Sequence, residues 1–429
     1  MSHRRLAAIL ALLGAGVAVA TAAYTLATSF PRGLLVMAGV LAAISAAWLG
    51  LVRRGGGRIV GFLAAALLIG VAIGALISGG NVLELVLIGA AFAIGLAGAG
   101  EAFAVRRSLP HADPPTRPVL FVNPRSGGGK ASKFNLAQEA ERRGIEVVGL
   151  GATDDLETLV RNSIARGANG LAMAGGDGSQ AIVAAIAAEH DLPYACIPSG
   201  TRNHFALDLG VNRDDVIGAL DAFHEGGGER RVDLGEVNGR VFVNNVSLGV
   251  YAEAVSQAGY REAKLQTLLA TIPQTLGPDV SPSKLRWTDP EGVKRQSAAV
   301  MLISNNAYLL GPVPGSGTRP RLDEAVLGVV DFSPPAGGDS GAARGWSEMT
   351  VAELEVDCDR SVPTGIDGES VTLEPPLRFR SRPGALRVRI AHQHPGASPS
   401  AGIPGGTWEG LVSLIRIAAG RNPGSMGGG

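Results

Sequence analysis

The stretch Gly170-Leu-Ala-Met-Ala-Gly-Gly-Asp-Gly-Ser179 decides the fold. Its first five residues form a short apolar run, which predicts a buried strand, and the rest form a tight glycine-rich loop. Residues 180–189 then have the pattern of a helix. Such a loop lets backbone N–H groups approach a phosphate, and the positive N-terminal end of the following helix favours the same anion.

The same alternation of strand, loop and helix surrounds this stretch. Strands are predicted over residues 119–122, 145–150 and 194–197, and helices over residues 133–143 and 155–166. This order predicts a parallel sheet with right-handed crossovers. Ligands of such sheets bind at the carboxyl ends of the strands.

Two further loops follow predicted strands, namely Asn123-Pro-Arg-Ser-Gly-Gly-Gly-Lys130 and Pro198-Ser-Gly-Thr-Arg-Asn203. The carboxyl ends of parallel strands share one edge of a sheet, so we expect the three loops to converge on one phosphate site. The site is not a P-loop, because Pro124 stands at the first glycine position of that pattern and Ala131 follows Lys130. The dinucleotide pattern G-x-G-x-x-G is not matched either.

The second soluble half is predicted to be mainly β. Alternating runs at 230–237 and 240–246 are joined by Asn238-Gly239, a strong hairpin signal. A helix is predicted over most of 251–276. Further strands are predicted at 285–288, 296–304, 327–332, 354–357 and 385–390. The series predicts an antiparallel, sandwich-like domain beside the parallel sheet.

The first hundred residues hold the apolar excess of the chain. Four apolar stretches are found at Leu6–Thr28, Gly33–Val52, Ile59–Ser78 and Val82–Gly100. At ~1.5 Å per residue each is long enough to cross a ~30 Å hydrocarbon layer. The sequence therefore predicts four transmembrane helices.

Arginines decide the predicted orientation of these helices. Arg4 and Arg5 precede the first stretch, three arginines lie between the second and third, and Arg106 and Arg107 follow the fourth. By the positive-inside rule, both termini and all residues after Arg107 are expected in the cytoplasm of a multi-pass cell-membrane protein.

Composition excludes several classes of function. The chain has 38 basic and 38 acidic residues, so bulk charge gives no support to a nucleic-acid partner. Cys196 and Cys358 are the only cysteines and are far apart in the sequence, which excludes a disulfide-rich scaffold. A 46% hydrophobic content argues against wholesale disorder.

Six motifs together resemble the diacylglycerol kinase catalytic domain family, which includes bacterial lipid kinases and sphingosine kinases. Three are the glycine-rich loops above. The others are Asn244-Asn-Val-Ser-Leu-Gly249, Leu322-Asp-Glu-Ala-Val-Leu-Gly328 and Gly365-Ile-Asp-Gly-Glu369. The resemblance covers about residues 117–392. It implies transfer of the γ-phosphoryl group of ATP to a lipid hydroxyl, with Mg²⁺ as cofactor.

The resemblance implies roles for particular residues. Glu369 corresponds to the general base of the family, with Asp367 beside it. Asp323 and Glu324 correspond to the metal motif, although the motif glycine is missing and the acid is duplicated. The residues implied in ATP binding are Asn123, Pro124, Arg125, Ser126, Gly127, Thr153, Gly175, Gly176, Asp177, Gly178, Ser179, Gln180, Ala181, Thr201 and Asn203.

The expected organisation is four transmembrane α-helices followed by a two-domain α/β kinase. Residues 1–107 form the membrane region and 108–118 a linker. Residues 119–228 form the α/β nucleotide-binding domain and 229–395 the mainly β lipid-acceptor domain. Residues 396–429 form a C-terminal segment with a short amphipathic helix, Trp408–Ala419, and a tail. That helix is expected to pack on its own chain or to contact the membrane.

Several alternatives stay open. An NAD kinase-type enzyme with a soluble acceptor shares the Gly-Gly-Asp-Gly loop, and a non-catalytic membrane nucleotide sensor would explain the altered Asp323-Glu-Ala325 segment. The expected partners are ATP, a lipid acceptor and the bilayer, and a homodimer is not excluded. Diacylglycerol, a sphingoid or ceramide-like base, a polyprenol and a glycolipid are all candidate acceptors.

Overall fold

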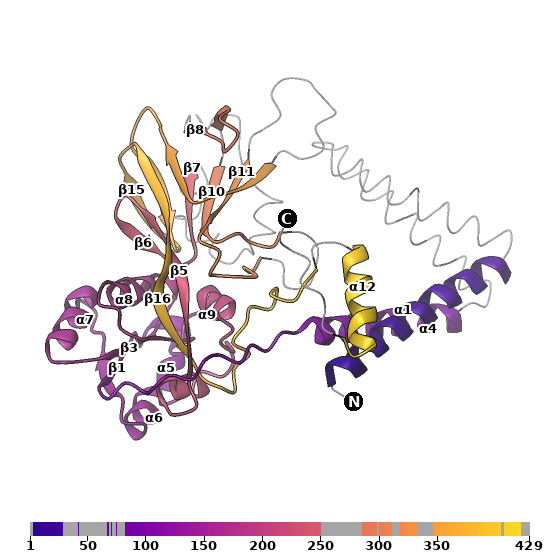
Figure 1. Ribbon diagram of the computed structural model, residues 1–429, viewed down its shortest axis with the longest axis horizontal. Helices are drawn as coiled ribbons and strands as arrows, with labels where there is room; N and C mark the ends of the chain where they lie inside the picture. Colours follow the sequence, from indigo (N-terminus) through magenta and orange to yellow (C-terminus); the bar gives the residue numbers. More distant parts are fainter. Residues whose placement is uncertain are drawn as a thin grey trace. The chain divides into compact units, whose positions relative to one another are not determined.

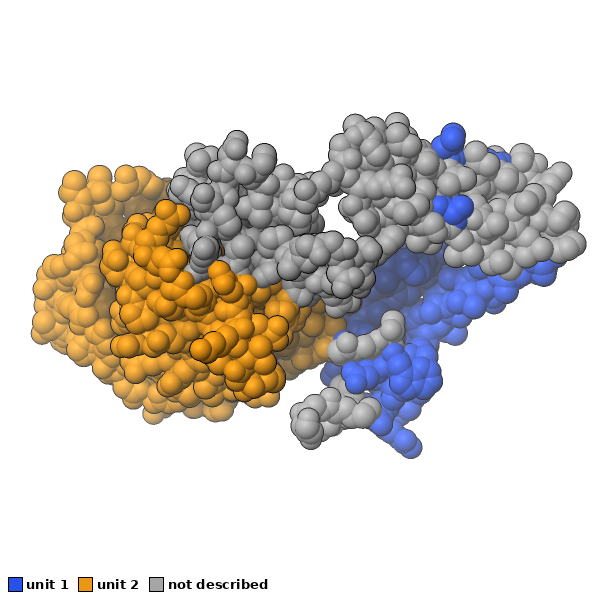
Figure 2. All heavy atoms as spheres, turned by 90° about the horizontal axis from the view of Figure 1, so that it is seen from above, with its two compact units in different colours: residues 1–104, 404–429 blue, residues 105–403 orange. Residues whose placement is uncertain are grey.

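The computed structural model of the chain describes residues 3–28, 82–249, 285–297, 300–310, 317–332, 346–404 and 407–421, together with four single residues between 29 and 81. The chain forms two compact units (Figure 2). One unit contains residues 1–104 and 404–429, and the other contains residues 105–403. The predicted helix over 251–276 lies outside the described residues.

A mixed eight-stranded sheet forms the base of the larger unit (Figure 1). The strand order is β2-β1-β3-β4-β16-β5-β6, and β13 also pairs with β16. The first four strands are parallel, as predicted. The strands are β1 (Pro118–Val122), β2 (Glu146–Gly149), β3 (Gly170–Ala174), β4 (Tyr194–Ile197), β5 (Gly228–Val237), β6 (Arg240–Phe242), β13 (Glu353–Val356) and β16 (Leu377–Ile390).

Strand β16 joins the two predicted domains. It runs parallel to β4 and antiparallel to β5, so the C-terminal part of the chain completes the first sheet. The sequence places a strand at residues 385–390, but the pattern of one strand says nothing about its partners. The parallel sheet therefore continues directly into the mainly β half.

Helices follow the parallel strands. They are α5 (Lys130–Lys133), α6 (Leu136–Arg142), α7 (Leu156–Ala165), α8 (Asp177–Glu189) and α9 (His204–Leu209), with 3₁₀ turns at Ser126–Gly128 and Gly218–Phe223. The helix predicted over 133–143 is confirmed for residues 136–142, but it is not continuous from residue 133. It is broken before α6 because Asn135 has a left-handed backbone, with φ of 47°. The side chain of Asp155 caps α7 by accepting from the Thr158 N–H.

An antiparallel six-stranded sheet forms the second layer, in the order β12-β11-β10-β7-β14-β15. Its inner face packs on the extended ends of β5 and β16 through a core that includes Val246, Ile303 and Phe379. The strands are β7 (Asn245–Gly249), β10 (Val300–Asn305), β11 (Leu327–Phe332), β12 (Trp346–Val351), β14 (Val362–Ile366) and β15 (Glu369–Leu373); β8 (Leu285–Thr288) and β9 (Lys294–Ser297) form a separate pair.

The smaller unit contains α1 (His3–Thr28), α4 (Val82–Phe103) and α12 (Thr407–Ala418). A Cβ at Gly14 would lie 2.6 Å from the Ala91 carbonyl oxygen, and one at Gly98 would lie 2.7 Å from the Ala7 carbonyl oxygen. The two long helices therefore pack antiparallel, with backbones in contact at small residues. Both are long and apolar enough to cross a membrane, by length and composition. The other two predicted spans lie outside the described residues.

The short C-terminal helix α12 packs on its own unit with one face. Ile417 is buried against Ala8 of α1 and Ala102 of α4, and the Arg5 Nε–H donates to the Ala418 carbonyl at 2.7 Å. The opposite face is apolar and exposed, with Trp408, Leu411 and Ile415. The predicted packing of this helix on its own chain is thus confirmed for one face only.

A backbone position in the larger unit yields a stability prediction. Ala325 has φ of 60°, and its N–H donates to the Asp233 Oδ2 at 2.7 Å. A left-handed backbone costs an L-residue about 1–2 kcal/mol, and glycine avoids that cost at some expense in unfolded-state entropy. We expect Ala325→Gly to raise the Tm of the detergent-purified chain by about 1–3 °C. Ala325→Val should lower it in the same thermal scan, and an equal effect of both changes would contradict this account.

Candidate active site

The three glycine-rich loops meet at one edge of the mixed sheet. They follow β1, β3 and β4, which are neighbours and parallel. A Cβ at Gly127 would lie 2.2 Å from the Ser199 carbonyl oxygen. A Cβ at Gly200 would lie 2.7 Å from the Gly176 Cα. The first loop therefore contacts the third, and the third contacts the second, at positions where no side chain fits. The loops therefore meet as predicted, and a phosphate site at this edge stays a prediction.

The loops present backbone donors and hydroxyl groups at this edge. Helix α8 begins after Gly176, and no side chain caps its first turn. Its first N–H groups and its dipole are therefore available to an anion. Ser126 is half-buried and Thr201 is exposed. This set of groups matches what a polyphosphate requires.

Two predicted ATP-binding residues fix the shape of the loops. The Asn203 Oδ1 accepts from the Gly200 N–H at 2.9 Å, and its Nδ2 donates to the carbonyls of Pro198 and Gly200. The Asp177 carboxylate accepts from the N–H groups of His204 and Phe205, both at 3.2 Å. Asp177 thus ties the second loop to the start of α9. Both side chains thus shape the site through hydrogen bonds within the protein.

Gln180 is also directed into the sheet. Its side chain is 1% exposed and its Nε2 donates to the carbonyls of Met173 and Ile197, while Tyr194 donates to its Oε1. These bonds join the ends of β3 and β4. Ala181 is buried beside it.

The remaining predicted nucleotide residues lie at the same edge. Asn123, Pro124 and Arg125 directly follow β1, where the Asn123 Oδ1 accepts from the Arg125 N–H at 3.1 Å. Gly175 contacts Ser179, because a Cβ at Gly175 would lie 3.1 Å from the Ser179 Cβ. Thr153 is exposed on the loop between β2 and α7, one strand further out.

The hairpin between β14 and β15 brings a carboxylate to the loops. Asp367 and Gly368 occupy its turn with φ of 48° and 88°, as a two-residue Asp-Gly hairpin requires. Glu369 begins β15 and is exposed. A Cβ at Gly178 would lie 2.4 Å from the Glu369 Oε1, so this carboxylate reaches the first turn of α8. The second layer thus contributes an acid to the site built by the first.

Asp367 serves the geometry of that turn. Its Oδ2 accepts from the Val243 N–H at 2.8 Å, and its Oδ1 accepts from the N–H groups of Asn244 and Asn245 at 2.8 and 3.1 Å. Desolvation raises the pKa of Asp367 to about 7, and the three N–H donors oppose that rise. All its bonds are internal to the protein, whereas Glu369 faces the loops.

Asp323 and Glu324 do not fit a structural Mg²⁺ site. Asp323 is paired with Arg321 at 3.0 Å and with Arg107 at 3.7 Å, and Glu324 lies 3.6 Å from Arg321. The nearby Asp233 accepts N–H donors on both oxygens. Within the described residues no three acidic, histidine or cysteine side chains are grouped to hold a metal. Arginine pairing therefore already balances the acids of this motif.

Sequence comparison places the chain among known kinases. Residues 117–237 match the diacylglycerol kinase catalytic domain. A probable lipid kinase YegS-like from Pseudomonas aeruginosa PAO1 is 26% identical over 302 residues, covering 66% of this chain and 95% of the relative. A diacylglycerol kinase from Bacillus subtilis is 31% identical over 182 residues, covering 41% of this chain and 58% of the relative.

Solved structures share the fold. A putative diacylglycerol kinase from Bacillus anthracis str. Sterne superposes with a TM-score of 0.51 at 18% identity, covering 65% of this chain and 96% of that structure. The parallel-rich sheet with an attached antiparallel sheet is therefore the two-domain α/β kinase fold. Residues 117–237 thus match the diacylglycerol kinase catalytic domain, and this match together with the lipid kinase relatives supports an ATP-dependent kinase.

Proposed function

We propose that this protein is a membrane-bound lipid kinase that transfers the γ-phosphoryl group of ATP to the hydroxyl of diacylglycerol or a related lipid. One observation carries the proposal. Glu369 of the antiparallel sheet meets Gly178 at the first turn of α8, so a carboxylate and a phosphate-binding loop face each other. Phosphoryl transfer needs mainly such positioning, together with charge stabilisation and a base for the hydroxyl proton.

The nucleotide phosphates lie on the three loops in this proposal. Backbone N–H groups of Gly127 and Gly176–Ser179 donate to the phosphate oxygens, and the dipole of α8 adds to the attraction. The Thr201 hydroxyl donates from the third loop. Asp177 and Gln180 tie neighbouring segments of the site together, and Asn203 fixes the shape of the third loop, through the bonds described above. A Mg²⁺ ion bound with ATP supplies further charge neutralisation.

Glu369 acts as the general base. Its carboxylate takes the proton of the lipid hydroxyl as the hydroxyl oxygen forms a bond to the γ-phosphorus. The bond from the γ-phosphorus to the β,γ-bridging oxygen breaks, and ADP leaves. Asp367 holds the turn that aims Glu369 and does not itself touch the substrate.

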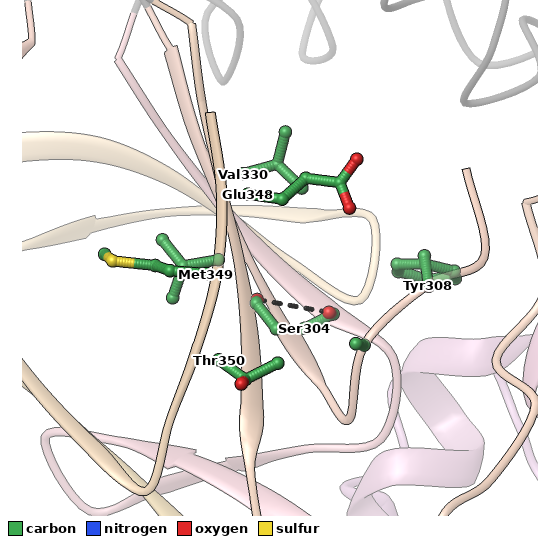
Figure 3. Close-up of a pocket in the computed structure, with 9 residues that line it drawn as sticks. Ser304, Tyr308, Val330, Glu348, Met349 and Thr350 are labelled. Atoms are coloured by element: carbon green, nitrogen blue, oxygen red, sulfur yellow. Dashed lines mark hydrogen bonds between the residues drawn. The ribbon is translucent and has the colours of Figure 1, made fainter. Parts of the chain in front are cut away.

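A pocket of about 240 Å³ on the antiparallel sheet supports an acceptor on this side of the molecule (Figure 3). Ser304, Val330 and Thr350 are among its lining residues, and Tyr308 lies across from them. The Tyr308 hydroxyl accepts from the Asn245 side chain at 3.1 Å, and the Asn245 N–H donates to Asp367. One end of the pocket thus adjoins the turn that carries Glu369. We assign the part of the acceptor nearest its hydroxyl to this end.

The helices of the smaller unit support the membrane location. The Arg4 Nε–H donates to the Ala102 carbonyl at 2.7 Å, so the start of α1 and the end of α4 lie together. The start of α1 carries Arg4 and Arg5, and Arg106 and Arg107 follow the end of α4. By the positive-inside rule these arginines favour a cytoplasmic position for the start of α1 and the end of α4. The exposed apolar face of α12 is suited to the lipid interface. The catalytic domain would then share a compartment with ATP.

The first functional prediction concerns the base. Glu369→Gln keeps the shape of the side chain but cannot accept the proton. We expect kcat for lipid phosphorylation to fall about 10²–10⁴-fold while ATP affinity is retained. Purified protein in mixed micelles, γ-labelled ATP, Mg²⁺ and a lipid panel give the rates. Glu374→Gln, an exposed acid of the same hairpin, is the matched control.

The outcomes of that assay also separate the alternatives. Retained turnover in Glu369→Gln would reject Glu369 as the base. Transfer to NAD instead of any lipid would favour the NAD kinase-type alternative. Tight ATP binding by the wild type without transfer to any acceptor would favour the nucleotide sensor.

The second prediction concerns the contact between loops. Gly200→Ala places a methyl group against the Gly176 Cα, and overpacking of this kind costs about 1–3 kcal/mol. We expect the dissociation constant for ATP to rise roughly tenfold. Gly149→Ala, where nothing lies within 4 Å of the added Cβ, should bind ATP normally. Equal ATP affinity of the two variants, measured by fluorescent-nucleotide titration, would show that the loop contact does not shape the site.

The third prediction concerns topology. The native Cys196 and Cys358 are buried, so an introduced cysteine gives a readable label. We expect Ser108→Cys, which follows α4, to react with an impermeant maleimide only in inverted vesicles. Asn81→Cys, which precedes α4, should react only in intact cells. Labelling of both from the same side, or release of the chain by an alkaline carbonate wash, would reject the multi-pass orientation.

A further inference from the structure

We propose that Arg319 is a positioning residue for phosphoryl transfer. Its guanidinium holds the segment Val243–Asn245, which fixes the Asp367 turn and thereby the direction of the Glu369 carboxylate. The inference rests on the proposed function, because it takes Glu369 as the base. It concerns a residue that lies outside the motifs of the sequence.

The side chain of Arg319 is fully buried, and each of its three guanidinium nitrogens donates a hydrogen bond. Its Nη1 donates to the Val243 carbonyl at 2.6 Å and to the Asn305 carbonyl at 2.9 Å, and its Nη2 donates to the Asn244 Oδ1 at 2.7 Å. The guanidinium carbon lies 5.4 Å from the centre of the Tyr308 ring. A planar group with five donors can make these contacts at once, and a lysine ammonium cannot reproduce them.

The same short segment is held from two sides. Arg319 binds the Val243 carbonyl and the Asn244 side chain, and Asp367 binds the N–H groups of Val243, Asn244 and Asn245. Arg319 is therefore connected to the Asp367 turn through two successive sets of hydrogen bonds, one on each side of Val243–Asn245. A shift of Val243–Asn245 would move Asp367, whose turn ends at Glu369.

The other end of Arg319 reaches the nucleotide loops. Its Nε donates to the Asp208 Oδ2 at 2.7 Å, and its backbone N–H donates to the Asp208 Oδ1 at 3.1 Å. Burial raises the pKa of Asp208, and the charge of Arg319 opposes that rise. Asp208 lies on α9, whose first N–H groups donate to Asp177 of the Gly-Gly-Asp-Gly loop. Arg319 therefore connects the segment that holds the Glu369 turn with α9, which in turn binds Asp177 of the phosphate loop.

A second buried arginine provides a matched control. Arg389 is 1% exposed, and its guanidinium donates to the carbonyls of Ala222, Asp113 and Ala112 at 2.8, 2.6 and 3.0 Å. Its replacement should disturb folding in the same way as replacement of Arg319. It is bonded near the end of β16 at Ile390, away from the Asp367 turn. A loss of kcat that occurs on replacing Arg319 but not Arg389 therefore cannot come from the loss of a buried arginine alone.

The experiment compares Arg319→Lys with Arg389→Lys in the full-length chain. We expect Arg319→Lys to lower kcat about 10–100-fold with little change in the KM for ATP, since a small misplacement of a catalytic group has effects of this size. Arg389→Lys should leave kcat unchanged. In the Glu369→Gln background, Arg319→Lys should cause no further loss of kcat, because the two residues act as one unit. Full multiplication of the two losses would overturn the proposal.

A second measurement does not depend on turnover. Hydrogen exchange of the Val243–Asn245 amides, followed by mass spectrometry, should be faster in Arg319→Lys and unchanged in Arg389→Lys. The double variant Asp208→Asn/Arg319→Met removes both buried charges and serves if the lysine variant does not fold. Unchanged exchange would refute the role of Arg319. If the wild type phosphorylates no lipid, the proposed function fails, and the exchange result still decides whether Arg319 holds the turn.

Discussion

The site depends on backbone segments that touch where no side chain can fit. Gly127 lies against the Ser199 carbonyl, and Gly200 lies against Gly176. These contacts let three loops from β1, β3 and β4 form one continuous surface of donors. A bulkier residue at either position would push the loops apart, because its Cβ would lie 2.2 Å or 2.7 Å from the facing backbone. In our proposal this close approach lets the loops surround a polyphosphate.

The three acidic side chains of the site differ in their hydrogen bonding and exposure. The hydrogen bonds of the Asp177 and Asp367 carboxylates come from backbone N–H groups. Asp177 therefore stabilises the start of α9, and Asp367 stabilises the β14–β15 turn. Glu369 is exposed and lies against the first turn of α8. A carboxylate thus serves structure where donors saturate it, and in our proposal the exposed carboxylate of Glu369 takes the proton. In our proposal Arg319 likewise stabilises the site through hydrogen bonds, at the junction between the two sheets.

The smaller unit shows a comparable use of small residues. Gly14 and Gly98 bring α1 and α4 into backbone contact, as close packing in lipid favours. The outer surfaces of both helices stay apolar, with Leu13 and Phe92 exposed. Helix α12 adds an exposed apolar face of its own beside them. These features support a membrane location, and the family resemblance does not account for them, because it begins after α4.

Sequence alone determined the parallel strand–loop–helix order, the Asn238-Gly239 hairpin and the three loops, because local patterns with periods of two and 3.6 residues and glycine-rich turns encode them. It also pointed to Glu369 through a motif. Tertiary structure alone decided that β16 completes the first sheet, that Asp177, Gln180 and Asn203 brace the loops, and that Arg321 occupies the acids at 323 and 324. It alone revealed Arg319, whose partners lie up to 111 residues away in the sequence. Pairing over such distances depends on which segments the fold brings together, and no local pattern contains that information.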